Sequence, residues 1–312
     1  MGGNAMTQRV FITGATGYLG SAIATRLLRA GHDVRGLARS QERASALEAL
    51  GVRAVLGAID ETERFLSELK NCDVAVHVAL DDRDPAAAAA ADQAAIEAFR
   101  AGAQDGRLRR MLYTSGTWVH GDTAGAVVDE TAPLAAAETV RWRPAHEEAA
   151  LDLAGEGFVT VVLRPGMVYG ARRGTLGNWF REARERRTVT FPGDGAQHWG
   201  MVHRDDVAEA YALALEHARG RSRYLLVDES RFTVRELAQA VARVTDAEVL
   251  PLDRETVLRT RGLTGAAELM DQQFTAARAR RELGWVPRHT SFVAEAEALF
   301  REWQSAPQAV VG

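Results

Sequence analysis

The sequence predicts an α/β fold with a doubly wound parallel sheet and a smaller C-terminal lobe. Strand-like apolar runs alternate with helix-like stretches through the first half of the chain, which is typical of a parallel sheet with helices on both faces. A glycine-rich turn follows the first run, and the alternation weakens after Pro165. With 312 residues and 46% hydrophobic content, the chain can bury a large core.

Six strands are expected before Pro165. We place them at Arg9–Thr13, Asp33–Ala38, Arg53–Leu56, Asp73–Ala79, Leu108–Thr114 and Phe158–Leu163. The fourth strand is apolar almost throughout, as expected of a strand covered on both faces. The intervening helices are predicted at Leu19–Ala30, Gln41–Leu50, Glu61–Lys70, Pro85–Gly102 and Pro144–Ala154.

The segment beyond Pro165 contains fewer clear elements. A strand is expected at Tyr224–Val227, and helices are expected at Trp179–Arg187, Asp206–His217, Val234–Val244 and Ala276–Leu283. The sequence shows no internal repeat and no flexible linker. We therefore expect the last third of the chain to form a lobe that packs on the sheet.

The glycine turn indicates a site for a dinucleotide. Thr13-Gly14-Ala15-Thr16-Gly17-Tyr18-Leu19-Gly20 follows a strand and opens a helix, whose N-terminus offers free N–H groups to phosphate. A sharp turn, a close approach to pyrophosphate and tight helix packing each favour glycine. The alternative is a glycine turn without a ligand. The expected contacts are Gly14, Ala15, Thr16, Gly17, Tyr18 and Leu19.

The end of the second strand favours NADP(H), with NAD as the alternative. An NAD site usually places an acidic residue there, but Asp33 lies at the opposite end of the strand and Arg39 and Ser40 follow its carboxyl end. A guanidinium pairs with a 2′-phosphate, which a carboxylate repels. Arg35 is a second candidate if its side chain faces the site. Asp60 is expected either to accept a hydrogen bond from the adenine amino group or to cap a helix.

Composition and charge reduce the number of functional classes to consider. The formal charge of −4 gives no support for nucleic-acid binding. Cys72 is the only cysteine, and scattered His, Asp and Glu residues do not reach metal-ligand spacing, so no disulfide or metal is expected. No signal peptide or membrane span is visible, and we expect a cytoplasmic protein without membrane contact.

Several further motifs resemble the extended short-chain dehydrogenase/reductase family, which includes nucleotide-sugar epimerases and dehydratases. The glycine turn matches the family's TGxxGxxG, and the resemblance covers almost the whole chain. The other matching segments are Val76–Ala79, Tyr113–Gly116, Val119–Gly121, Arg164–Gly170, His203–Ala208 and Leu283–Pro287.

The resemblance implies a Rossmann-type NAD(P)-binding domain at 6–170, to which elements from 200–228 return. Residues 171–199 and 229–312 would then form a substrate-binding lobe for a small molecule. The helices that begin at Pro85 and Pro144 are expected to pair with their copies in a possible homodimer. The resemblance also implies that Ala79, Leu80, Thr114 and Ser115 lie along the nicotinamide ribose, and that the nicotinamide is flanked by Pro165, Gly166, Met167 and Val168.

The chain departs from the family at its catalytic pair, Tyr-x-x-x-Lys. The best register puts Arg143 at the tyrosine and Glu147 at the lysine, and a shift by two gives Ala145 and Ala149. No register restores the motif, because the only lysine is Lys70. The chain is therefore similar to the atypical branch of the superfamily, in which the glycine turn persists and the catalytic set erodes.

Four residues are candidates for the catalytic work. Arg143 and His146 share a helix face with Glu147, so His146 could act as general acid and Arg143 could stabilise an oxyanion or bind an acidic substrate. The alternative is an ion pair between Arg143 and Glu147, with a packed His146. Ser115 matches the family's serine, although strict spacing puts Gly116 there. Tyr169 is a reserve proton donor.

The function predicted from the sequence is an NADP(H)-dependent oxidoreductase that acts on a small carbonyl or alcohol. A cofactor-retaining epimerase or dehydratase is one alternative. A cofactor-binding redox sensor without chemistry is the other, because both members of the catalytic pair are missing. Substrate contacts are expected from Trp118, Trp142, Trp179, Arg172, Arg173 and Trp199, which would suit an aromatic or acidic molecule.

Overall fold

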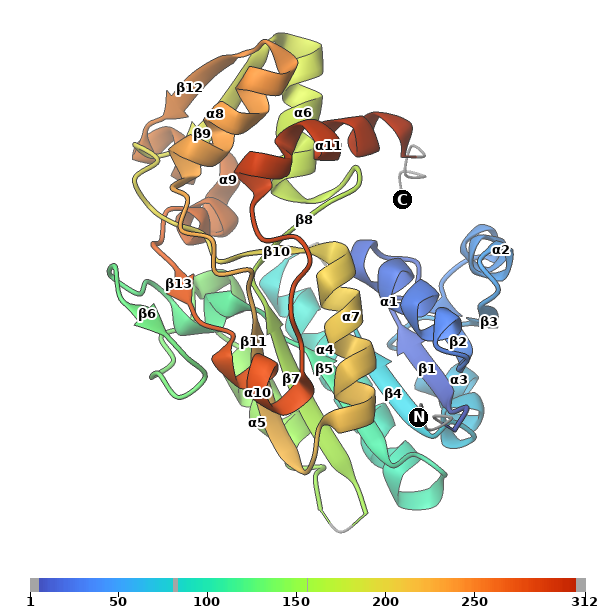
Figure 1. The fold of residues 1–312 in the computed structure, drawn as a ribbon. Coiled ribbons are helices and arrows are strands. Elements are labelled where there is room, and N and C mark those ends of the chain that lie inside the picture. The colour runs from blue at the N-terminus through green and yellow to red at the C-terminus, as the bar shows by residue number, and fades with distance from the viewer. Residues whose placement is uncertain (1–5, 81–83, 156, 307–312) are drawn as a thin grey trace.

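A seven-stranded parallel sheet forms the centre of the molecule (Figure 1). The computed structural model describes residues 6–80, 84–155 and 157–306. The strand order is β11-β7-β5-β4-β1-β2-β3, and every neighbouring pair is parallel. The predicted α/β, doubly wound fold is confirmed. The strands are β1 (Arg9–Thr13), β2 (Asp33–Ala38), β3 (Arg53–Leu56), β4 (Val74–His77), β5 (Arg110–Thr114), β7 (Val159–Pro165) and β11 (Arg221–Leu226).

Helices cover both faces of the sheet because successive strand residues point to opposite sides. In β1, Val10 and Ile12 belong to one hydrophobic cluster and Phe11 to another. The first cluster includes residues of α1 (Tyr18–Arg29), α2 (Gln41–Ala49) and α7 (Arg204–His217). The second includes residues of α3 (Thr62–Lys70), α4 (Pro85–Asp105) and α5 (Arg143–Leu151).

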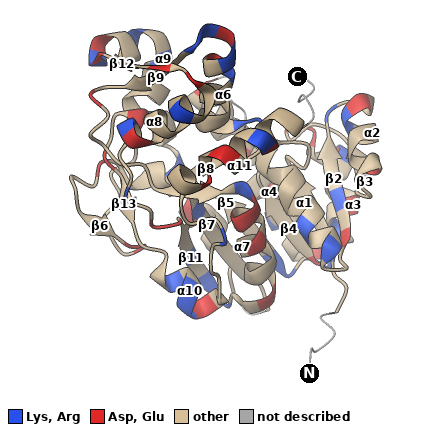
Figure 2. Cartoon of the chain, turned by 45° about the horizontal axis from the view of Figure 1, so that its top comes forward, with Lys and Arg blue, Asp and Glu red and all other residues tan. Residues whose placement is uncertain are grey.

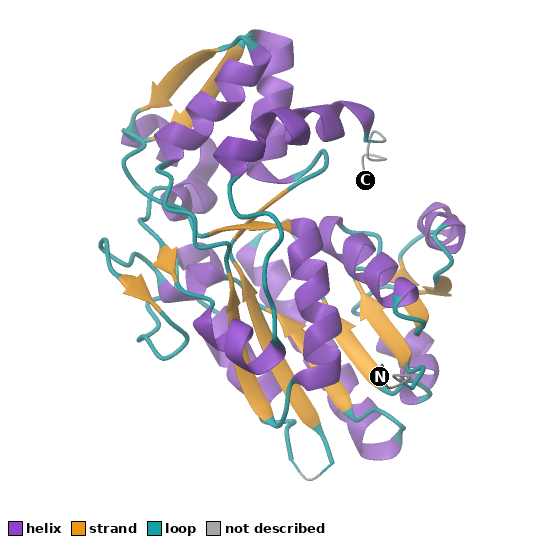
Figure 3. Ribbon diagram, in the orientation of Figure 1, coloured by secondary structure: helices purple, strands orange, loops and turns teal. Residues whose placement is uncertain are grey.

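A second body has its own hydrophobic core at one end of the sheet (Figure 3). Two short parallel pairs accompany it, one of β8 (Met167–Tyr169) with β10 (Met201–His203) and one of β9 (Thr188–Pro192) with β12 (Glu248–Leu252). The helices of this lobe are α6 (Gly174–Arg186), α8 (Val234–Thr245), α9 (Arg254–Glu268) and α11 (Phe292–Ser305).

Part of the segment assigned to the lobe returns to the sheet instead. In α10 (Ala277–Leu283), Ala279 and Leu283 are buried in the core of the sheet, together with Trp285. Just before it, β13 (Gln273–Phe274) pairs with β6 (Val127–Val128). The segment 229–312, expected to belong to the lobe, thus includes aromatic and aliphatic side chains around α10 that complete the face of the sheet that α7 covers.

Charged side chains of both signs are spread over the helices. Figure 2 shows acidic and basic segments side by side on α10 and on α11. Within the described ranges, no helix combines the length and the apolar character that crossing a bilayer requires.

Candidate functional site

The glycine turn forms a close-packed cradle at the start of α1. Gly14 has a φ of +73°, and a Cβ there would lie 2.6 Å from the backbone nitrogen of Ala79. Gly17 donates its N–H to the carbonyl oxygen of Gly14 at 2.8 Å and caps α1 without a side-chain hydrogen bond. The next N–H groups of the helix therefore have no side-chain partner at the cap. This geometry fits the pyrophosphate of a dinucleotide.

The other residues expected at this turn are at least partly buried and contact the surrounding structure. Ala15 is fully buried and Thr16 is half-buried. Tyr18 donates its hydroxyl to the carbonyl oxygen of Gly170 at 2.7 Å, which ties the turn to the segment after β8. Leu19 packs against the core of the sheet.

A basic side chain that sequence reasoning missed reaches the turn from α2. Nη1 of Arg43 donates to Oγ1 of Thr16 at 3.2 Å. Ser40 caps α2 by accepting the N–H of Arg43 at 3.3 Å, and Arg39 is exposed beside it. Arg43 lies one helical turn after Ser40, and this spacing is the feature of the sequence from which its position near the turn could have been predicted. Arg39, Ser40 and Arg43 thus follow the carboxyl end of β2.

The structure decides between alternatives that the sequence leaves open for Arg35 and Asp60. The guanidinium of Arg35 is buried and pairs with Glu68 and, at 3.0 Å, with Asp33, so it does not face the dinucleotide site. Asp60 is exposed and does not cap α3, because Glu61 occupies the N-cap position. An adenine contact remains the open role for Asp60.

A cavity of about 610 Å³ lies beyond the carboxyl ends of β4, β5 and β7. Ligands of open α/β sheets bind in this place. The segments that follow these strands, including the starts of α4 and α5, supply most of its wall, and α9 of the lobe adds Leu263 and Thr264. The wall comprises Leu80, Asp84, Pro85, Ala88, Ser115, Gly116, Thr117, Trp118, Val119, Thr139, Val140, Trp142, Arg143, Pro165, Gly166, Met167, Val168, Leu263 and Thr264.

Six of the residues expected along the nicotinamide and its ribose, namely Leu80, Ser115, Pro165, Gly166, Met167 and Val168, line this cavity. Ala79 packs against Gly14 at the turn. Thr114 is half-buried, and its Oγ1 donates to the carbonyl oxygen of His77 at 2.5 Å. The cavity and the glycine turn therefore both lie at the carboxyl ends of strands of the same parallel sheet.

Arg143 and Ser115 place polar groups in an otherwise largely apolar wall. Arg143 is 9% exposed, and its Nε has no hydrogen-bond partner within the described ranges. The same holds for Oγ of Ser115 and Nε1 of Trp142. A Cβ on Gly116 would lie 4.0 Å from Nη1 of Arg143, so the guanidinium reaches the end of β5. These three buried polar atoms therefore belong to residues of the wall and have no hydrogen-bond partner among the described residues.

His146 points away from this wall. Its Nδ1 lies 2.8 Å from Oδ2 of Asp92 on α4, and its ring packs edge-on to Trp142 with centroids 4.9 Å apart. Asp92 also accepts from Tyr113 at 2.8 Å and contacts Nε2 of His77 at 3.0 Å. Burial by itself would raise the pKa of Asp92, but hydrogen bonds from His146 and His77 outweigh it and hold the pKa below its ordinary value.

Glu147 pairs with a residue other than Arg143. Its Oε1 accepts from Nε of Arg164 at 2.9 Å, and both side chains are about 1% exposed. Arg164 also contacts Nε2 of His120 at 3.0 Å. The three helix residues expected on one face therefore diverge, with Arg143 at the cavity, His146 at α4 and Glu147 at β7. The proposed ion pair between Arg143 and Glu147 does not form.

Tyr169 does not reach the cavity. It is fully buried in the core of the lobe, and its hydroxyl donates to Oδ2 of Asp228 at 3.4 Å. Burial, followed by the charge of Asp228, raises the pKa of Tyr169 above its ordinary value. These surroundings argue against its role as a proton donor.

The aromatic and arginine candidates for substrate contact divide into two groups. Trp118 and Trp142 line the cavity. Trp179 and Trp199 instead stack on each other in the lobe, with ring centroids 5.7 Å apart, and the guanidinium of Arg172 lies over the ring of Trp303.

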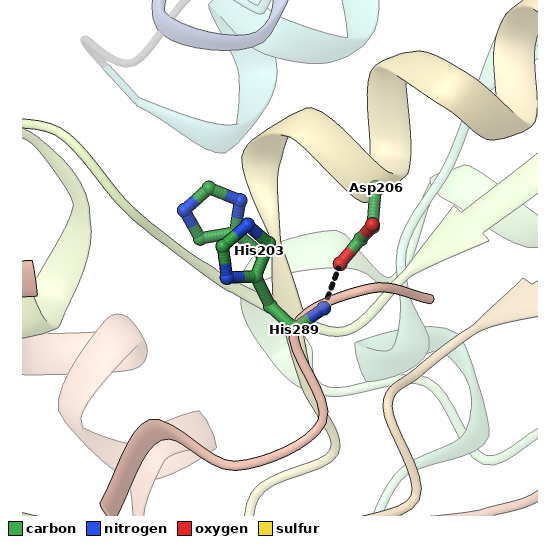
Figure 4. Close-up of side chains that lie close together, drawn as sticks. All are labelled: His203, Asp206 and His289. Atoms are coloured by element: carbon green, nitrogen blue, oxygen red, sulfur yellow. Dashed lines mark hydrogen bonds between the residues drawn. The ribbon is translucent and has the colours of Figure 1, made fainter. Parts of the chain in front are cut away.

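Apart from the cavity, three residues of types that can bind a metal lie close together. Candidate ligand atoms of His203, Asp206 and His289 lie within 4.8 Å of one another (Figure 4). The carboxylate of Asp206 accepts the backbone N–H groups of Arg288 and His289, and the two imidazoles stack with centroids 3.8 Å apart. The two stacked rings do not direct their in-plane lone pairs at one point, which argues against a shared metal ion. The cluster instead connects α7 to the chain segment before α11. Sequence spacing gave no signal for it.

Comparison with known proteins identifies relatives of the whole chain. Residues 10–226 match the model of the NAD dependent epimerase/dehydratase family. A 4-hydroxy-2-methyl-3-oxo-4-farnesyl-3,4-dihydroquinoline-1-oxide ketoreductase from Stigmatella aurantiaca is 29% identical, with 89% of this chain and 80% of the relative covered. A UDP-glucose 4-epimerase from Mycolicibacterium smegmatis is 27% identical, over 90% and 94% of the two chains.

Solved structures share the fold. A dTDP-glucose 4,6-dehydratase from Streptomyces venezuelae, solved with NAD bound, superposes with a TM-score of 0.81 and 21% identity, covering 95% of this chain and 97% of that one. This likeness confirms the Rossmann-type fold that the sequence predicts.

Proposed function

The chain belongs to the NAD dependent epimerase/dehydratase family, and we propose that it is an NADP(H)-dependent reductase of a small carbonyl compound. The observation that carries the proposal is the place of Arg143 at the wall of a largely apolar cavity beside Ser115, where its Nε has no hydrogen-bond partner among the described residues. The ketoreductase relative favours reduction as the net reaction.

The proposed preference for NADP(H) rests on Arg39, Ser40 and Arg43. A bound dinucleotide would supply a hydride from its nicotinamide ring, and Ser115 and the segment Pro165–Val168 would hold that ring. Gly14 and Gly17 would hold the pyrophosphate at the start of α1. Asp60 would accept a hydrogen bond from the adenine.

Arg143 would bind the substrate's carbonyl oxygen together with Ser115. The guanidinium stabilises the negative charge that develops on this oxygen, and the hydroxyl of Ser115 donates a second hydrogen bond. His146 acts behind the wall as a positioning residue, because Asp92 fixes one nitrogen of its ring and the ring supports Trp142. The loop residues and α9 would enclose the substrate's body. Within the cell we propose a cytoplasmic protein, and a homodimer formed through α4 and α5 remains a prediction.

The test is a titration of the purified protein with NADPH and NADH, followed by nicotinamide fluorescence, with a panel of carbonyl compounds in the same plate. We expect tighter binding of NADPH and its net consumption with at least one carbonyl compound. An epimerase would convert substrate without net consumption of the dinucleotide. A redox sensor would bind NADPH, and its biological activity would survive Arg143→Ala and His146→Ala. Failure to bind either nucleotide would overturn the proposal.

A further inference from the structure

From the chemistry of the cavity we infer that this protein reduces conjugated carbonyl compounds, enones or quinones, and that Arg143 holds the resulting delocalised oxyanion. The inference rests on the proposed reductase function and narrows its substrate class. It depends on which side chains line the cavity and on whether any of them can donate a proton to the substrate.

The residue at the position of the family's tyrosine is a permanent cation. An arginine stays protonated at every pH at which a protein is folded, so it stabilises an oxyanion without giving it a proton. Among the described residues of the cavity wall, Arg143 and Asp84 are the titratable ones. Asp84 is exposed and caps α4 by accepting the N–H of Ala87 at 2.8 Å. The described wall thus offers a cation that can hold an anion, and none of its described residues is an acid suited to protonate that anion.

This arrangement discriminates between substrates. Hydride addition to an isolated ketone yields an alkoxide, a strong base that needs a proton donor in the transition state. Hydride addition to the β-carbon of an enone moves the C=C electron pair through the carbonyl group onto oxygen and yields an enolate, a far weaker base. A quinone likewise yields a hydroquinone monoanion. A fixed guanidinium and hydroxyl suffice to stabilise these anions.

The step balances with a reduced nicotinamide dinucleotide as the reductant. The β-carbon gains the hydride with its two electrons, the dinucleotide is oxidised, and the enolate oxygen rests on Arg143 and Ser115. Water then supplies one proton to the α-carbon. Apolar residues such as Val140, Met167 and Leu263 would contact the conjugated carbon skeleton.

The first experiment uses 4-nitrophenol, whose anion resembles a delocalised oxyanion and whose ionisation is followed by absorbance. In the protein without nucleotide, we expect the pKa of the bound phenol to fall by about one unit or more, because a cation within reach favours the anion. Arg143→Gln should abolish this shift, and Ser115→Ala should reduce it. Arg141→Gln is the matched control, because Arg141 pairs with Glu138 outside the cavity and is mostly exposed.

The second experiment compares substrates. With NADPH present, 2-cyclohexenone and a benzoquinone should be reduced at least tenfold faster than cyclohexanone, and cyclohexenone should yield the saturated ketone. An unshifted phenol pKa, an equal shift in Arg143→Gln, or preferential formation of the allylic alcohol would each overturn the inference. A protein that shifts the phenol but binds no NADPH would disprove the reductase function separately, because the phenol assay contains no nucleotide.

Discussion

Glu147 and Arg164 form a buried ion pair between α5 and β7, with Oε2 2.5 Å from Nη2 and Oε1 2.9 Å from Nε. By the register that the sequence favours, Glu147 would stand where the family places its lysine, and its partner Arg164 comes from the neighbouring strand β7. The pair fastens α5 to the sheet.

Glu147→Gln should destabilise the fold strongly. Removal of one member of a buried pair leaves the other charge unpaired, which typically costs about 3–5 kcal/mol. Urea unfolding followed by circular dichroism measures the change. Glu148→Gln is the matched control on the same helix, because its half-exposed side chain pairs with Arg221 and Arg223 at the surface and should cost under about 1 kcal/mol. Equal effects of the two variants would contradict the assignment.

Arg43→Ala should weaken NADPH binding without a matching loss for NADH. A charge-assisted hydrogen bond contributes about 1.5–3 kcal/mol, so the NADPH dissociation constant should rise roughly 10- to 100-fold. Fluorescence titration with both nucleotides measures the ratio. Arg64→Ala, an exposed arginine on α3, serves as the control. If NADH and NADPH lose affinity alike, Arg43 acts on the fold of the turn and not on a 2′-phosphate.

Gly14→Ala should abolish nucleotide binding. The new Cβ would collide with the backbone of Ala79, and the positive φ adds strain. Gly31→Ala separates the two effects, because Gly31 has a φ of +87° but no neighbour within 4 Å of a Cβ. We expect Gly31→Ala to cost about 1 kcal/mol of stability and to leave binding intact. Calorimetry and fluorescence titration together test this, and retained binding in Gly14→Ala would refute the close approach.

Stability should fall as the pH drops from about 6.5 to 4. Burial, and then His289, lowers the pKa of His203 to about 4, while burial and then Arg164 lower that of His120 to about 4. Both groups protonate in the unfolded chain near pH 6.5. Their contribution is therefore complete above that pH and is lost toward pH 4, by roughly 3 kcal/mol each at most. Urea unfolding across this range measures the slope.

His203→Asn is the variant for this pH dependence. An asparagine keeps an acceptor for the N–H of Asp205, which His203 caps at 3.2 Å, but it does not titrate. The decline between pH 6.5 and 4 should become shallower. An unchanged slope would assign the effect to other groups.

Local sequence signals were sufficient for the sheet and for the dinucleotide turn. The strands β1, β2 and β3 begin and end where the apolar runs do, because each run is bounded by glycine or charged residues. The lobe was harder to predict. The strands β9 and β12 pair over a long sequence separation, and α9 bends at Gly262, which has a φ of +54°. Periodicity carries no information on either feature.

The side-chain partners in the site were the least predictable part. Helical spacing correctly groups Arg143, His146 and Glu147 within about one turn, but it does not say what lies opposite each residue. Asp92 on α4 and Arg164 on β7 decide where two of these side chains point. These partners come from the packing of distant segments, which a single sequence does not encode in its spacing.

The return of α10 to the sheet limits the ways in which this protein can acquire new substrate specificities. The chain leaves the sheet after β7, returns through β10 and α7, leaves again for α8, returns at α10 and ends on the lobe at α11. The two bodies are thus interlaced, and no single cut yields either one intact. Proteolysis should not liberate a stable half, and grafting a foreign lobe would need several junctions at once. New specificities are therefore expected to arise by replacement of wall residues such as Leu263, and not by exchange of modules.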